Sequence, residues 1–162
     1  MTDIPAGENH ETPEDVAWAF HPEQAAWAQT GFPRWADAGP WIRYCFSPPD
    51  AKAWTEQGFT AESAAIWFFY GFTSVMDAVA WRACGFDNPH DAHPWHELGF
   101  FPKWAAGFRK QRFTPEEADP WASFDIDPAR ARDLHDVGID PEMGYEDMRR
   151  KGGDPGIRMK VW

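Results

Sequence analysis

Three of the six histidines lie within seven residues, and they are the side chains in this sequence best suited to metal chemistry. His90, His93 and His96 stand close to two aspartates, Asp87 and Asp91. A spacing of three places His93 and His96 on one face of a helix, and a histidine cluster of this kind can bind zinc or nickel. An intervening proline and the lack of a fixed fourth ligand favour the alternative, surface or helix-capping histidines.

Other catalytic signals are weak. The sequence contains no nucleophile elbow, no phosphate loop and no zinc-protease signature, and nothing selects a pair of carboxylates for hydrolysis. Cys45 and Cys84 are too few for a disulfide scaffold, and we expect two small reduced core residues. The chain is therefore predicted to be non-enzymatic and to need no cofactor.

An internal repeat, Trp-x-x-x-Gly-Phe, predicts the elements that position these side chains. Its first position, called the lead residue below, recurs every 13 or 14 residues, at Trp27, Trp41, Trp54, Trp67, Trp81, Trp95, Phe108, Trp121, Leu134 and Met148. Alanine stands three residues before the lead in eight of these ten units, on the same helix face. A fixed period indicates stacked units, and we expect the lead residues from Trp27 to Trp121 to form the core.

Each unit carries the signals of one short helix. In residues 113–121, Thr114 can cap the helix, Pro115 suits the first turn, and Glu117 completes a capping box. Ser, Thr or Asp follows the Phe-like residue in seven of nine units, the exceptions being Pro33 and Phe101. The glycine fits a left-handed C-terminal cap, so each unit is a helix of about eight to ten residues plus a tight turn.

The predicted fold is all-α: a single-domain α-solenoid or superhelix of about ten short capped helices, one per repeat. The repeat domain spans residues 12–151, and it includes a shortened first unit that ends at Trp18. Residues 1–11 and the basic tail 152–162 are expected to be flexible. The pattern Gly-Phe-(Ser/Thr/Asp)-Pro-Glu-x-Ala-x-x-Trp resembles tandem short-helix repeats of some bacterial and phage proteins. One unit is also similar to the Gly-Phe loop of ubiquitin-associated domains.

One unit departs from the repeat in a way that suggests binding. The two residues after the lead are polar or small in most units, but after Trp67 they are Phe68 and Phe69, followed by Tyr70. The repeat predicts that both phenylalanines face outward, where an aromatic pair marks a binding or self-association surface. The alternative is that this helix is covered on every side.

Two tryptophans, Trp35 and Trp104, fall outside the repeat phase and are further candidates for partner contacts. Trp104 lies in residues 100–113, which hold the only basic patch within residues 1–148. A basic patch with aromatic residues could touch nucleic acid, but a solvated or internally paired face is the alternative. The acidity of the chain argues against direct binding of nucleic acid.

Composition limits the class of protein. A hydrophobic content of 43% excludes a disordered chain, and no apolar run approaches the roughly 20 residues of a membrane span. The first 14 residues lack signal-peptide features, so a cytoplasmic location without membrane contact is expected. The net charge is −11; residues 149–162 carry five basic side chains and one aspartate, so residues 1–148 carry −15.

These observations favour a protein-binding repeat module with an acidic surface and a central aromatic patch. The partner would be a protein that is basic or has an apolar groove, and a homodimer through Phe68 and Phe69 is a further option. The first alternative is an acidic nucleic-acid mimic that inhibits a DNA-acting enzyme, as in phages or mobile elements. The second is a metal-dependent or hydrolytic enzyme that uses the segment from His90 to His96.

Overall fold

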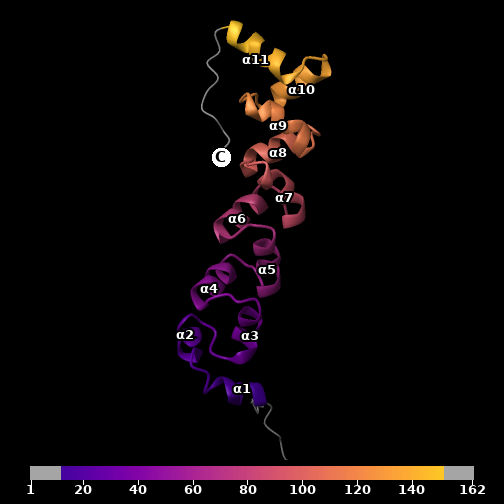
Figure 1. The fold of residues 1–162 in the computed structure, drawn as a ribbon. Coiled ribbons are helices and arrows are strands. Elements are labelled where there is room, and N and C mark those ends of the chain that lie inside the picture. Colours follow the sequence, from indigo (N-terminus) through magenta and orange to yellow (C-terminus); the bar gives the residue numbers. More distant parts are fainter. Residues whose placement is uncertain (1–11, 152–162) are drawn as a thin grey trace, which may run out of the picture. The chain divides into compact units, whose positions relative to one another are not determined.

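The computed structural model describes residues 12–151, and these residues form helices and turns with no strand. The helices follow the chain in Figure 1 as α1 (Pro13–Trp18), α2 (Gln24–Gln29), α3 (Trp35–Arg43), α4 (Pro48–Glu56), α5 (Ala61–Phe69), α6 (Val75–Ala83), α7 (Pro89–Glu97), α8 (Pro102–Lys110), α9 (Pro115–Ser123), α10 (Pro128–Asp136) and α11 (Pro141–Arg150). The predicted all-α, solenoid-like repeat is confirmed. The expectations for residues 1–11 and 152–162 lie outside the described residues.

The chain divides into two compact units, Met1–Ile66 and Trp67–Trp162, and α5 runs across the division. In the second unit each helix lies beside its neighbour in sequence, as with α8 and α9 or α10 and α11. Helices two apart are also in contact, as with α6 and α8 or α8 and α10. In the first unit α1 packs on α3 in the same way. Each repeat is therefore stabilised by the next repeat and by the one after that.

The helix starts follow the predicted capping chemistry. Thr114 accepts a hydrogen bond from the backbone N–H of Glu117, whose carboxylate accepts one from the Thr114 N–H, so the capping box is present. Ser47, Thr60, Asp127 and Asp140 accept similar bonds at their helix starts. Each cap satisfies a backbone N–H that the first turn leaves without a partner.

Two predicted caps are wrong by one residue. The helices α6 and α7 start after Ser74 and Asn88, whereas the sequence pattern pointed to Thr73 and Asp87. Both helices belong to 14-residue intervals, from Trp67 to Trp81 and from Trp81 to Trp95. The extra residue enters the turn before the helix, and α3 to α10 all keep nine residues. From α3 to α10 the period of 13 or 14 residues therefore reports the length of the turn, whereas α11 has ten residues and takes the extra residue into the helix.

The helix ends share one hydrogen-bond pattern. In all nine units from Trp27 to Leu134, the N–H five residues after the lead donates to the lead carbonyl at 2.9–3.2 Å. The N–H of the residue before it donates to the carbonyl one residue past the lead at 2.9–3.1 Å. These two bonds define the Schellman motif, in which the lead residue is the third from the helix end.

The Schellman turn needs one residue with positive φ, and the sequence supplies glycine there in six of the nine units. The remaining three units use Cys45, Arg112 and Asp125, with φ of 60°, 62° and 54°. Cys45 is therefore exposed at the turn, and Cys84, which ends α6, is only half-buried, so the expectation of two core cysteines was wrong. At Gly31, Gly58 and Gly138 a Cβ would meet nothing within 4 Å, whereas at Gly85 it would lie 3.1 Å from Nη2 of Arg109.

The core is mainly a series of Trp and Phe rings from successive repeats. The lead residues from Trp27 to Leu134 are buried, and the alanines three residues before them are fully buried where they occur. Within a unit the Trp and Phe rings meet edge to face, with centroids 4.8 Å apart for Trp54 and Phe59. The Phe ring then meets the next lead residue, as Phe72 meets Trp81 at 5.9 Å. Edge-to-face pairs of this kind add to the free energy gained from burial.

The positive-φ positions give a direct test of this turn. Replacing Cys45 with glycine should raise the free energy of unfolding by about 0.5–1 kcal/mol, because a non-glycine residue in this region is strained by about 1–2 kcal/mol. Replacing Gly58, where φ is +78° and nothing obstructs a Cβ, with alanine should lower it by about 1 kcal/mol. Urea unfolding of both variants measures the two changes, and changes of equal sign would contradict the assignment.

Candidate functional site

The residue two positions after the lead is the outward position of the repeat. It is polar or small in most units: Gln29, Arg43, Glu56, Ala83, Glu97, Lys110, Ser123, Asp136 and Arg150. Two units instead place phenylalanine there, Phe20 after Trp18 and Phe69 after Trp67, and these rings are 84% and 83% exposed. They are the most exposed large apolar side chains of residues 12–151. Sequence inspection identified Phe69 but missed Phe20, whose unit is shortened.

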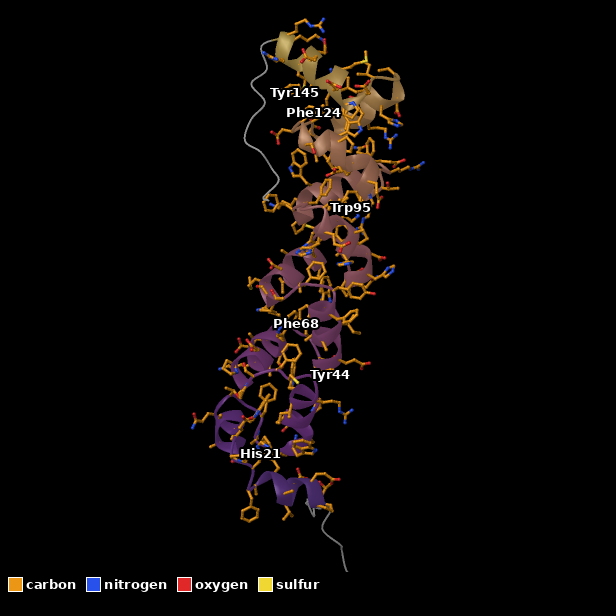
Figure 2. The ribbon with its side chains drawn as sticks, in the orientation of Figure 1. His21, Tyr44, Phe68, Trp95, Phe124 and Tyr145 are labelled. Carbon is orange, nitrogen blue, oxygen red and sulfur yellow. The ribbon has the colours of Figure 1, made fainter. Side chains whose placement is uncertain are left out.

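The end of α5 gathers three aromatic residues, Phe68, Phe69 and Tyr70, called the α5 patch below. Phe68, labelled in Figure 2, is 51% exposed. The Tyr70 ring lies edge-on to Phe69 at 5.5 Å and to His93 at 5.3 Å. His93 Nδ1 also lies 3.0 Å from the Tyr70 carbonyl oxygen, so helix α7 holds this residue in place. The patch therefore combines exposed rings with a fixed, half-buried tyrosine.

The position directly after the lead is not simply outward, as the sequence suggested. His96 lies on the Phe72 ring at 4.6 Å, and the Arg109 guanidinium lies 3.9 Å from the centre of the Phe86 ring. In each pair the covering residue is the one that directly follows its lead, and the phenylalanine that it covers belongs to the unit two earlier. The cause is the contact between helices two apart, which a linear repeat does not display. The planar side chains of His96 and Arg109 at this position were the one sign in the sequence of these ring contacts.

The basic segment 100–113 is partly used inside the protein. Arg109 covers Phe86 and donates a hydrogen bond from Nη2 to the Gly85 carbonyl oxygen at 2.7 Å. Lys103 and Lys110 remain exposed. Trp104 is half-buried against Phe108, with ring centroids 5.8 Å apart. This arrangement agrees with the alternative of an internally engaged face, and it separates Trp104 from the α5 patch along the chain.

The structure gives the three clustered histidines three different surroundings. His90 is exposed, His93 contacts Tyr70, and His96 is half-buried against Phe72. Within residues 12–151, no group of three or more His, Cys, Asp or Glu side chains lies close enough to hold a metal ion. In this arrangement the three histidines do not converge on one point: His93 contacts Tyr70 and His96 lies on Phe72, both of which belong to the repeat two earlier.

Trp35 lies in the first compact unit and packs against residues close to it in sequence. Its ring lies over Gly39 of the same helix, where a Cβ would come within 2.8 Å of the indole, and its centroid is 5.5 Å from that of Trp18. The half-buried ring forms one wall of a groove of about 490 Å³. The groove is lined by Trp35, Ala36, Gly39, Pro40, Arg43, Tyr44, Thr60, Ala61 and Glu62. Trp35 thus belongs to a groove within residues 1–66.

Comparison with protein-family models, with curated proteins and with solved structures gives no match for this chain. Among the described residues, no helix combines the length and the apolar character that a membrane crossing needs. The candidate site therefore depends on geometry alone, and the α5 patch is its strongest element.

Burial lowers the pKa of His96 below its ordinary value, an effect that Asp77 opposes and His93 reinforces. The folded protein binds this proton less readily than the unfolded chain, so stability should be unaffected above about pH 6.5 and should fall as the pH decreases below it. His96→Phe keeps a ring on Phe72 without a charge. The Tm of this variant relative to the parent should therefore rise between about pH 7 and pH 5.

The exposed His90 provides a control for the substitution itself, because His90→Gln should leave the Tm at pH 7 unchanged. A Tm difference between His96→Phe and the parent that stays constant with pH would contradict the role of His96 burial.

Proposed function

We propose that the chain is a non-enzymatic protein-binding module and that the α5 patch is its anchor. The observation that carries this proposal is the 83% exposure of Phe69 beside the 51% exposure of Phe68, at repeat positions that other units fill mainly with polar or small residues. Large aromatic side chains that become buried on binding supply much of the affinity of protein interfaces. The fold gains little from an exposed ring, whereas a partner gains its full burial.

The partner is a protein with an apolar pocket bordered by basic residues. The chain carries a net charge of −11, and such a surface attracts a basic partner and raises the rate of encounter. Tyr70 supports this arrangement because its ring is fixed by His93 and borders Phe69, so less freedom is lost on binding. Acidic residues then set the orientation, and the aromatic rings provide most of the affinity.

The test compares two phenylalanines that occupy the same repeat position. The parent, Phe69→Ser and Phe20→Ser are each used to capture partners from the native cell, and captured proteins are identified by mass spectrometry. Phe69→Ser should lose the partner, with affinity reduced about 30-fold or more, equivalent to about 2 kcal/mol for an anchor residue. Phe20→Ser should retain it, although it removes an equally exposed ring.

Equal capture by the parent and Phe69→Ser contradicts the proposal. A captured DNA-acting enzyme whose binding survives Phe69→Ser, weakens with salt and competes with DNA would instead support the acidic mimic. A homodimer through the α5 patch would appear as a self-association that Phe69→Ser abolishes. Circular dichroism of both variants checks that the helical fold is retained.

A further inference from the structure

The groove beside Trp35 is a second surface of the first compact unit, and α3 and α5 form its walls. Residues of α3 and its C-terminal cap, from Trp35 to Tyr44, line one wall, and residues 60–62 at the start of α5 line the other. Its volume of about 490 Å³ lies within the range of roughly 300–1,000 Å³ that is typical of ligand sites. All the lining residues belong to the compact unit that ends at Ile66, so the groove is formed within one unit.

Two aromatic rings form much of the apolar surface of the groove. The half-buried Trp35 ring lies over Gly39, where a Cβ would come within 2.8 Å of the indole. Tyr44, labelled in Figure 2, caps the end of α3 and is 42% exposed. The two residues stand nine positions apart in the sequence, which is about 13.5 Å along the axis of a helix. The α3 wall therefore has an aromatic residue at each end.

Both aromatic residues of the groove also carry a hydrogen-bond donor that the fold does not use. Within residues 12–151, neither the indole N–H of Trp35 nor the hydroxyl of Tyr44 has an acceptor. The indole N–H of Trp27 also lacks a partner, but it is buried, whereas that of Trp35 is not. Water satisfies the two donors of the groove in the free protein, so a ligand that covers them must supply acceptors in its place.

The groove is also lined by one cation and one anion, Arg43 and Glu62, which belong to opposite walls. The described part of the first compact unit has two further lysine or arginine side chains, Arg34 and Lys52. These two pair with carboxylates three and four residues further along at 2.9 and 3.9 Å, whereas Arg43 has no ion pair among residues 12–151. Glu62 is likewise unpaired in that part of the chain. The groove therefore presents one unpaired charge of each sign.

We propose that this groove binds a proline-rich segment of a partner protein in the extended polyproline II conformation. A partner helix engages its own carbonyl groups in internal hydrogen bonds, so it would cover the donors of Trp35 and Tyr44 without satisfying them. A polyproline II segment has no internal hydrogen bonds, and its carbonyl groups are free to accept. Proline rings pack against aromatic walls, and their fixed φ reduces the conformational freedom that is lost on binding.

The length and the charges of the groove define the segment further. Polyproline II rises about 3.1 Å per residue, so four or five residues cover the length of the wall from Trp35 to Tyr44. Charge complementarity places an acidic residue of the segment at Arg43 and a basic residue at Glu62. With one charge of each sign the segment is neutral overall, so the acidity of the chain does not repel it. The groove contains no residue of the α5 patch, so this inference goes beyond the proposed function and does not depend on it.

The experiment titrates the full chain with the peptide Glu-Pro-Pro-Pro-Pro-Lys, blocked at both ends, and follows the heat of binding. One peptide should bind per chain with a Kd below roughly 1 mM, and Tyr44→Ala should weaken binding at least about tenfold because it removes a ring and a donor. Phe20→Ser is the matched control and should bind like the parent, since it removes a more exposed ring of the same compact unit that does not line the groove. A peptide with two Gly-Ser pairs in place of the prolines should bind at least about tenfold more weakly to the parent. Circular dichroism checks that both variants keep the helical fold.

A double-mutant cycle tests the assigned charge contact. Changing the glutamate of the peptide to glutamine should weaken binding to the parent about threefold and should leave binding to Arg43→Gln unchanged. Lys52→Gln removes the same charge from the same compact unit outside the groove, so it should respond to the peptide change as the parent does. Phe69→Ser should bind the peptide like the parent, so failure of this proposal and failure of the α5 patch are distinguishable. No binding of the proline peptide at roughly 1 mM, equal binding of the Gly-Ser peptide, unchanged binding to Tyr44→Ala, or a glutamine effect that persists in Arg43→Gln would each overturn the proposal.

Discussion

The hydrogen bond from the N–H five residues after each lead to the lead carbonyl is the constraint on which the rest of this structure depends. It ends the helix at a fixed residue and turns the chain back over the last turn. The Phe ring that follows is thereby held against the lead ring, 4.9 Å away in the case of Phe86 and Trp81. The next helix starts two or three residues after this Phe, and its own lead ring packs on that Phe. The residue at which each helix ends and the spacing between its lead ring and the next Phe ring both follow from this one closure.

An isolated helix of nine residues is only marginally stable in water, so the ring contacts between repeats must supply most of the stability of the fold. The fully buried alanines three residues before the leads allow neighbouring helices to approach the rings closely. Each repeat contacts the next two, and this makes the structure a chain of local interactions.

The sequence alone predicted the features that arise from local chemistry. Thr114 and Glu117, the glycine turns and the buried leads are all specified by residues within one repeat. The features that the sequence did not predict depend on contacts between repeats that are two apart in the chain. The sequence offered His96 as a surface or capping histidine, or else as a metal ligand, but not as the side chain that covers Phe72, and Arg109 covers Phe86 in the same way. The cap at Ser74 was missed because a 14-residue period does not say whether its extra residue enters the turn or the helix.

The α5 patch stands out because the two tryptophans outside the repeat phase have contacts within the fold. Trp104 packs on Phe108, and Trp35 lies over Gly39 and beside Trp18, so each has a contact within its own unit. The position of Phe69 is one that the repeat fills equally well with Glu97 or Lys110, so the helix does not require an apolar residue there. Burying a Phe ring on a partner contributes about 1.5–3 kcal/mol, which folding leaves unused at this position. The repeat therefore separates two kinds of aromatic residue, those that build the array and those whose burial is available to another molecule.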